Sequence, residues 1–338
     1  MILQLAIAFF ASFLLCAGMI WLGLPYASRL ALAVPNSRSS HDTPTPQSGG
    51  LFLALTIVLA LVFCGWNQNF LIDLFPILLL IISLTLIGWL DDRRGLPVLL
   101  RLSLFSGISI AYAFFRAPTL NGFISPYLGI FLSACFLIVM INVTNFMDGI
   151  DGMVVAEFVP MSVLIAILTG GGVIGPLYGF QAIIIAGALL GFFIFNRPKA
   201  KIFLGDSGSL VAGFIAGILL LELSEKQGPH AILFLPLYFL CDAGLTLLRR
   251  LLRGEAIWKA HREHFYQQAF DNGQSNWSII IRLALCNIVL CALFYSTTLL
   301  PFWADVIGLI FALGLMVLLL VSLSRNLRIY ERKSRGTV

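Results

Sequence analysis

The chain has 338 residues, of which 59% are hydrophobic and only 11% are charged, and its formal net charge is +5. Soluble domains are typically about half apolar and about a quarter charged, so this composition excludes an ordinary soluble fold and predicts an all-α integral membrane protein. The positive charge does not indicate nucleic-acid binding, because the basic residues are divided among several short segments.

Eleven apolar runs follow one another along the chain, each close to the roughly 20 residues that a helix needs to cross a bilayer. The first run is too long to be a cleaved signal peptide, and it lacks the basic leader that such a peptide has. No internal repeat or low-complexity linker separates the runs, which predicts one polytopic domain over 1–338. The runs are 2–23, 49–66, 70–90, 98–115, 125–143, 153–170, 174–195, 207–224, 230–248, 277–298 and 302–323.

The Lys and Arg residues between these runs are strongly sided. Seventeen of them follow runs one, three, five, seven or nine or lie in the C-terminal tail, whereas the opposite segments hold only Arg116 and Lys226. Lys and Arg are enriched in the cytoplasmic loops of membrane proteins. The split therefore predicts a periplasmic N-terminus and a cytoplasmic C-terminus.

Five aspartates lie at the predicted cytoplasmic ends of the runs. Asp91 and Asp92 follow the third run, Asp148 and Asp151 lie in NVTNFMDGIDG after the fifth, and Asp206 precedes the eighth. A single loop aspartate is commonly a helix cap or a turn residue, but two adjacent aspartates repel each other and are not expected to gain anything as caps. Five carboxylates on one face predict a hard divalent cation such as Mg²⁺, which takes one or two carboxylates and fills its shell with water and phosphate oxygens.

The residues around these aspartates suit a phosphorylated ligand. Asp206-Ser-Gly-Ser precedes a predicted helix, whose N-terminus attracts anions, and Lys201 is one of several cations nearby. Arg101 lies one to two turns into the fourth run. It is either a side chain that reaches back to the membrane interface or an anchor for a phosphate at the headgroup level.

The last predicted cytoplasmic loop, which contains RRLLRGEAIWKAHREHF, is much longer than the others, and long loops are usually functional. His261 and His264 lie three residues apart beside Arg262, and no third metal ligand is nearby. We therefore expect the two histidines and Arg262 to contact phosphate, with Glu263 pointing away. The alternative for the cations is an amphipathic stretch that lies on the membrane surface.

Taken in order, these motifs resemble those of the bacterial polyprenyl-phosphate N-acetylhexosamine-1-phosphate transferases, or glycosyltransferase family 4. The resemblance rests on TPTPQSGGL, DD, NVTNFMDGIDG, FNRPKAKIFLGDSGSL and the basic histidine loop, at 43–51, 91–92, 142–152, 195–210 and 249–268. It implies that a UDP-N-acetylhexosamine donates its sugar 1-phosphate to undecaprenyl phosphate, with release of UMP. It also implies a multi-pass protein of the bacterial inner membrane with its active site on the cytoplasmic face.

The resemblance further implies roles for individual residues. Asp206 and Asn145 would bind Mg²⁺, for which Mn²⁺ is the alternative. Asp91 and Asp92 would either deprotonate the lipid phosphate or help to hold the metal, and we favour the second. Asp148 and Asp151 would form the acidic loop of the nucleotide-sugar site, Asn196 and Phe203 would contact uridine, and Arg101 would be the cation for the lipid phosphate. Either His261 or His264 could contact the donor diphosphate. From the residues alone, we also expect Lys201 and Arg262 to bind phosphate.

The form of the last loop, His261-Arg262-Glu263-His264, resembles the branch that starts O-antigen chains with 6-deoxy-N-acetylhexosamines. We expect this sugar type or GlcNAc, in the first membrane step of O-antigen or cell-envelope polysaccharide synthesis. One alternative is the peptidoglycan phospho-N-acetylmuramoyl-pentapeptide transferase. A transporter, the alternative from another class, would place ionisable residues near mid-membrane. Here the acids within runs lie near their ends, and Glu157 and Asp242, the two that lie furthest inside, are near cytoplasmic ends. The sequence leaves a homodimer open.

Overall fold

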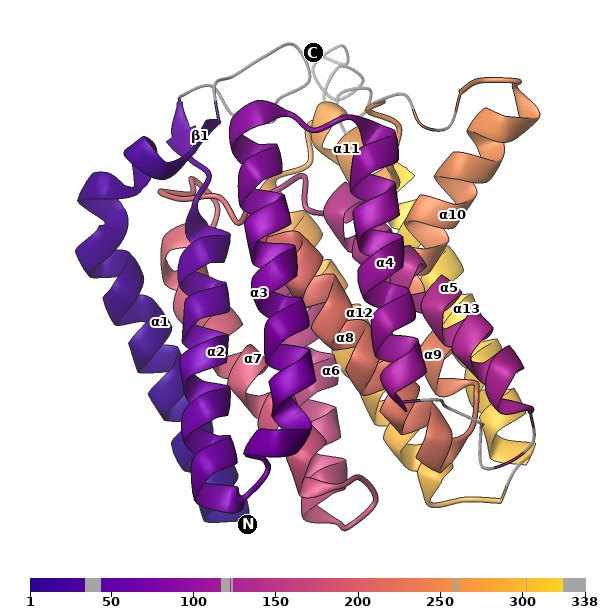
Figure 1. Cartoon of the computed structure of the whole chain (residues 1–338). Coiled ribbons are helices and arrows are strands. Elements are labelled where there is room, and N and C mark those ends of the chain that lie inside the picture. The colour runs from indigo at the N-terminus through magenta and orange to yellow at the C-terminus, as the bar shows by residue number, and fades with distance from the viewer. Residues whose placement is uncertain are drawn as a thin grey trace.

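The computed structural model describes residues 1–33, 44–116, 122, 124–256, 258, 261–301 and 303–324. In these ranges the long elements are all helices, and the strands are one antiparallel pair of two residues each, β1 (Leu32–Ala33) and β2 (Thr45–Pro46). The long helices stand side by side in one bundle (Figure 1). The predicted all-α class is confirmed.

Ten helices in the described ranges are long and apolar enough to cross a membrane, and they match ten of the eleven predicted runs. They are α1 (Ile2–Leu30), α2 (Gly49–Gln68), α3 (Leu71–Arg94), α4 (Val98–Arg116), α5 (Pro126–Met147), α6 (Met153–Gly170), α7 (Pro176–Asn196), α8 (Asp206–Gln227), α12 (Asn276–Thr298) and α13 (Trp303–Ser324).

The prediction of one continuous helix over 230–248 is wrong. The structure divides this run into α9 (Ala231–Phe234) and α10 (Leu237–Leu252), and a short helix, α11 (Phe265–Asp271), follows later in the chain. The break falls at Leu235 and Pro236, because proline has no N–H to donate and its ring crowds the preceding turn. Beyond the break, α10 leans away from its neighbours (Figure 1).

Helix α8 forms the centre of the bundle. Its apolar stretch is 94% buried, against 28% for α1 and α4 and 33% for α13, whose outer faces are apolar and exposed. A helix that is apolar all round belongs inside a protein or in a membrane, and here the buried one is surrounded by helices whose apolar outer faces suit lipid. The N-terminus of α8 is therefore held inside the bundle rather than on its surface.

Glycines let α2 and α3 approach the first turn of α8 closely. A Cβ atom on Gly50 would lie 2.1 Å from the backbone nitrogen of Gly208, and one on Gly88 would lie 2.5 Å from the carbonyl carbon of Asp206. The backbone N–H of Gly50 also donates to the carbonyl of Leu204 at 2.8 Å. The sequence DD at the end of α3 is thereby placed beside the start of α8.

The first and last membrane helices both run toward this end of the bundle. After α1 the chain enters β1, which pairs with β2 in the register Leu32↔Pro46, and the Pro46 carbonyl accepts from Phe203 just before α8. At the end of α13, the carbonyl of Leu323 accepts from the Gln274 side chain at 3.0 Å, just after α11. The N-terminus lies at the opposite end of the bundle (Figure 1).

Some of the residues used for the predictions lie outside the described ranges. They are Thr43 at the start of the 43–51 motif, Phe302 at the start of the last run, and part of the cytoplasmic cations, namely Arg38, Lys259 and those of the tail 325–338. The sidedness of the chain stays a prediction, drawn from the distribution of Lys and Arg.

We predict that a reporter enzyme active only in the periplasm is inactive when fused to the C-terminus and active when fused to the N-terminus. The reason is that α1 and α13 both end where the basic segments gather, and basic segments remain in the cytoplasm. Insertion of the same reporter after Gln227, in a segment predicted to face out, is the positive control. An active C-terminal fusion together with an inactive insertion after Gln227 would reverse the orientation.

Candidate active site

Asp91 and Asp206 share one arginine. The Nη1 atom of Arg101, in the first turn of α4, lies 2.6 Å from Asp91 Oδ2 and 3.5 Å from Asp206 Oδ2. Asp91 is buried and also accepts the backbone N–H of Leu96 at 2.6 Å. The guanidinium group of Arg101 is thus turned inward to two carboxylates. This excludes the alternative that its side chain only reaches back to the membrane interface. Its predicted contact with a lipid phosphate stays a prediction.

Asp92 caps the N-terminus of α8 from another helix. Its carboxylate accepts the backbone N–H groups of Asp206 at 2.9 Å and Ser207 at 3.2 Å, and the side-chain amide of Gln47 at 2.9 Å. These N–H groups belong to the first turn, where a helix has no internal acceptors. The expectation that adjacent aspartates gain nothing as caps is wrong, because Asp91 and Asp92 turn to different partners.

Asp206 also meets Asn145 of α5. The Asn145 amide nitrogen donates to Asp206 Oδ1 at 2.8 Å and to Ser209 Oγ at 3.2 Å. Within the described residues, no three His, Cys, Asp or Glu side chains are grouped so as to hold a metal ion by themselves. The oxygen donors around Asp206 nevertheless fit a Mg²⁺ ion whose shell is completed by water and phosphate oxygens. They do not fit a closed cage made of protein alone.

Asp151 and Asn196 order the loops beside this cluster. Asp151 accepts the backbone N–H groups of Lys199 at 3.0 Å and Ala200 at 3.2 Å. The buried Asn196 accepts the N–H of Gly152 at 2.9 Å and donates to the carbonyl of Ile202 at 3.0 Å. Both ends of the Asn196 amide therefore bind backbone, so its predicted contact with uridine would have to share one of them.

Phe203 and Lys201 lie in the segment that links α7 to α8. The Phe203 backbone donates to Pro46 and accepts from Gly49, and its ring is half-buried. Lys201 is exposed, and its backbone N–H donates to Phe195 at 2.8 Å. The positions allow both side chains to meet a ligand at this end of the bundle, and their predicted roles remain predictions.

Asp148 is the C-cap residue of α5, just outside the membrane helix. Burial, and after it repulsion by the other carboxylates, raises the pKa of Asp148 well above its usual range. The carboxylates that act on it are Asp206, Asp92 and Asp151. Four acidic side chains from α3, α5, α8 and the loop after α5 are thus close enough to interact, as their predicted shared face requires.

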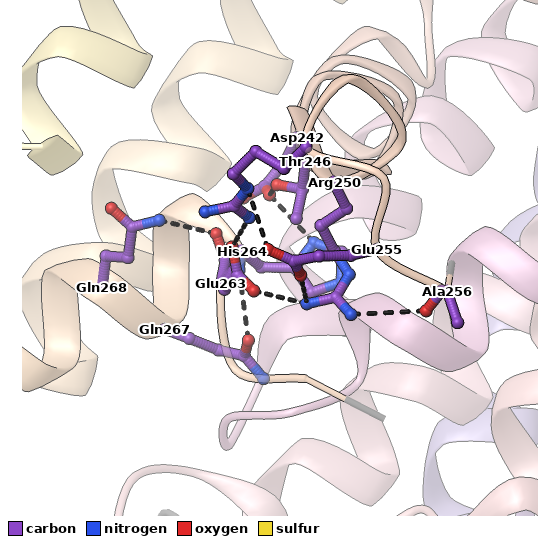
Figure 2. Close-up of polar contacts among 10 residues, drawn as sticks. Asp242, Thr246, Arg250, Glu255, Ala256, Glu263, His264, Gln267 and Gln268 are labelled. Atoms are coloured by element: carbon purple, nitrogen blue, oxygen red, sulfur yellow. Dashed lines mark hydrogen bonds and ion pairs between the residues drawn. The ribbon is translucent and has the colours of Figure 1, made fainter. Parts of the chain in front are cut away.

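The last loop is anchored by Asp242, an acid in α10 to which the sequence motifs assigned no role. Figure 2 shows its carboxylate turned toward His264. Asp242 Oδ1 lies 3.1 Å from His264 Nδ1, and the same carboxylate accepts the backbone N–H groups of Phe265 at 3.0 Å and Tyr266 at 3.2 Å. Asp242 therefore caps α11 and holds the ring of its N-cap residue.

The basic part of the loop is largely neutralised by acids within it. Arg250 pairs with Glu255 at 2.9 Å and with Glu263 (Figure 2). Arg253 pairs with the same two glutamates. These guanidinium groups, that of Arg253 first, hold the pKa of Glu263 below its usual range. Glu263 is thus turned to the arginines. Arg262, predicted to contact phosphate, pairs with Asp271 at 2.8 Å.

His261 lies beside His264, with ring centroids 5.0 Å apart. The two histidines are in contact, as expected. They do not share one helix, however, because His261 precedes α11 and His264 is its N-cap residue. The Nδ1 atom of His261 is buried and has no hydrogen-bond partner within the described ranges. Burial, and then the nearby His264, lowers the pKa of His261, so its imidazole is mainly neutral near pH 7.

Tyr266 docks the last loop onto the acidic loop. Its hydroxyl donates to the carbonyl of Phe146 at 3.1 Å, two residues before Asp148. A Cβ atom on Gly149 would lie 2.0 Å from this hydroxyl, so only glycine allows the approach. The structure thereby brings the histidine loop and the NVTNFMDGIDG segment together. The sequence motifs assigned no role to three of these residues: Tyr266, Asp242 and Gln47. Of the three, only Asp242 stood out, because it is an acid within an apolar run.

Sequence comparison gives one matching family model and several similar proteins of known or probable activity. The family model described as glycosyl transferase family 4 matches residues 74–224. A decaprenyl-phosphate N-acetylglucosaminephosphotransferase of Mycobacterium leprae is 27% identical, over 77% of this chain and 75% of the relative. A probable undecaprenyl-phosphate N-acetylglucosaminyl 1-phosphate transferase of Bacillus subtilis is 24% identical, over 78% of each chain. A phospho-N-acetylmuramoyl-pentapeptide-transferase of Streptococcus pneumoniae is 33% identical, over 69% of this chain and 77% of the relative.

We predict that Asp148→Asn makes the protein more stable at pH 7 when no divalent metal is present. Because the pKa of Asp148 is raised in the folded state, the unfolded chain loses this proton first, near pH 4, and stability falls as pH rises from there toward the folded pKa. Asparagine carries no such proton. Each pKa unit removed is worth about 1.4 kcal/mol. The measurement is thermal unfolding in detergent with chelator, from pH 4 to 8.

The matched control is Asp151→Asn. This variant weakens the hydrogen bonds from Lys199 and Ala200 and should therefore be less stable than the parent. An Asp148→Asn protein that melts below the parent at pH 7 would contradict the repulsion described above.

Proposed function

The chain belongs to glycosyl transferase family 4, and on that premise we propose that it transfers an N-acetylhexosamine 1-phosphate from a UDP-sugar to undecaprenyl phosphate. An oxygen of the lipid phosphate attacks the β-phosphorus of the donor, the bond from that phosphorus to the bridging oxygen breaks, and UMP leaves. The observation that carries the proposal is the Asp91–Arg101–Asp206 cluster at the end of the central helix α8. It lies where a lipid phosphate and a water-soluble nucleotide sugar can meet.

Asp206 and Asn145 would hold the divalent cation, Mg²⁺ or Mn²⁺. When bound, the ion would neutralise charge that develops on the transferred phosphate and the departing UMP. Arg101 already holds two of the carboxylates together, and it would place a positive charge at the same point. The N-terminus of α8, with the backbone of DSGS, adds a partial positive charge that favours phosphate.

Asp91 and Asp92 act by positioning rather than as bases. Asp92 accepts two backbone N–H groups of α8 and one from Gln47, and Asp91 is bound to Arg101 and Leu96. The oxygens of both carboxylates are already occupied by these donors, which leaves little room to take a proton from the lipid phosphate. The lipid phosphate is already mostly ionised near neutral pH, so no strong base is needed.

The donor sugar is a 6-deoxy-N-acetylhexosamine or N-acetylglucosamine, and the product enters O-antigen or another cell-envelope polysaccharide. The form of the last loop, His261-Arg262-Glu263-His264, supports this choice. The second candidate donor is the UDP-N-acetylmuramoyl-pentapeptide, which the S. pneumoniae relative favours. Because nucleotide sugars are cytoplasmic, the site would face the cytoplasm across the bacterial inner membrane.

UMP release by detergent-purified protein tests the reaction and the donor together. The protein is incubated with undecaprenyl phosphate and Mg²⁺ and with each member of a panel of UDP-N-acetylhexosamines or the UDP-N-acetylmuramoyl-pentapeptide. Rapid UMP release with one of the hexosamines supports the proposal. Release with the pentapeptide donor alone transfers the protein to peptidoglycan synthesis, and no release with any donor contradicts the proposed reaction.

We predict that Asp206→Asn abolishes turnover and that excess chelator does the same to the parent. The amide is nearly isosteric but lacks the charge with which the carboxylate would bind the ion. Asp73→Asn is the matched control, because Asp73 is an exposed aspartate in the first turn of α3, at the far end of the bundle. Parent rates in chelator, or near-parent rates in Asp206→Asn, would exclude a metal at Asp206.

We predict that His261→Ala and His264→Ala each lower kcat/KM for UMP release by about 10²- to 10³-fold, the cost of losing one contact to a transferring phosphate. His230→Ala is the control, because His230 faces Asp305 at 3.5 Å at the other end of the bundle. Glu263→Gln is unsuitable as a control, since Glu263 binds two arginines of the loop. Both variants keeping more than half of the parent activity per folded molecule would make the loop an interfacial anchor.

A further inference from the structure

We propose that Asp242 is a positioning residue that holds His264 in one tautomer, with the proton on Nδ1, so that Nε2 is the atom offered to the substrate. The state of the ring follows from the structure alone. Only the effect on turnover rests on the proposed function.

The surroundings of Asp242 decide which atom of the pair is the donor. Its fully buried carboxylate accepts two backbone N–H groups, from Phe265 and Tyr266, and meets the hydroxyls of Tyr238 at 3.0 Å and Thr246 at 3.4 Å. Each of these four groups donates, so the oxygens of the Asp242 side chain act here as acceptors. His264 Nδ1, 3.1 Å from the same oxygen that binds Phe265, must therefore donate.

The ring of His264 is also fixed in direction. It stacks on the Tyr266 ring with a 15° interplanar angle and centroids 5.8 Å apart, and His261 lies against it. Only 3% of the residue is exposed. With Nδ1 facing Asp242, Nε2 is the remaining ring nitrogen. Tyr266 in turn is tied to the carbonyl of Phe146, next to the acidic loop.

A helix cap alone does not require this arrangement. The two backbone N–H groups of α11 would be satisfied by Asp242 whichever residue stood at position 264. The imidazole adds a group whose Nε2 can take up a proton from solvent water, while the carboxylate stabilises the resulting positive charge. His264 can then donate from Nε2 to a phosphate oxygen without a bare charge inside the protein.

The direct test is the tautomer itself. The chain has four histidines, so a protein labelled with ¹⁵N in histidine gives few ring signals, and the pair that is lost in His264→Gln belongs to His264. The parent without substrate, above pH 8, is expected to show protonated Nδ1 and unprotonated Nε2. A parent spectrum with the proton on Nε2 overturns the proposal, and this readout does not depend on any enzymatic activity.

Turnover provides the second test. Asp242→Asn should move the His264 proton toward Nε2 and lower kcat by roughly 10- to 100-fold, with little change in KM for the UDP-sugar. Thr246→Val is the matched control, because it removes another donor from the same carboxylate but leaves the contact with Nδ1. It should keep both the tautomer and the kcat of the parent.

The outcomes separate the two proposals. An unchanged kcat per folded molecule in Asp242→Asn, with the tautomer also unchanged, would reduce Asp242 to a helix cap. If no donor supports turnover in the parent, the proposed reaction fails, while the parent spectrum still decides the state of His264. Should Asp242→Asn not fold, the parent spectrum and the Thr246→Val control remain.

Discussion

The constraint on which this structure depends is that helix N-termini buried in a membrane protein must find acceptors for their N–H groups, because no bulk water is available there. Acids from other helices supply them at three places. Asp92 of α3 accepts from the first turn of α8, Asp242 of α10 from that of α11, and Glu157 of α6 from Phe239 in the first turn of α10, at 3.4 Å. Glu157 is itself held by Asn287 at 2.7 Å. These acids, which are rare in so apolar a chain, are therefore explained first by the backbone N–H groups from which they accept hydrogen bonds.

The caps also concentrate negative charge. Tying Asp92 to α8 places it beside Asp206, and the close approach of Gly88 to α8 brings Asp91 to the same point. Among the contacts described, Arg101 offsets part of the repulsion between these groups. Burial, and after it repulsion by the neighbouring carboxylates, raises the pKa of Asp148. A cation bound at Asp206, as we propose, would relieve this repulsion and would therefore stabilise the folded protein.

In the last loop, unlike among the gathered aspartates, positive and negative side chains are paired with each other. Arg250 and Arg253 are neutralised by Glu255 and Glu263, which makes the loop a compact, ion-paired segment rather than a loose basic strand. Its docking depends on α10, which begins at the Pro236 break and carries Asp242. The loop meets the acidic segment through Tyr266 and Gly149. His261 and His264 are therefore placed by contacts of this loop with α10 and with the segment at the end of α5.

The sequence by itself determined the ten continuous spans, the clustering of acids at one end and the family resemblance, because span length, hydropathy and motif order are local properties of the chain. It did not show the break at Pro236, since proline is tolerated in membrane helices and an apolar run reads alike whether or not it bends. The partners of Asp92, Asp242 and Arg250 were decided only by tertiary structure. Asp92 reaches Asp206 across 114 positions, and which N–H groups a carboxylate caps depends on helices meeting in space, a relation that spacing along the chain does not encode.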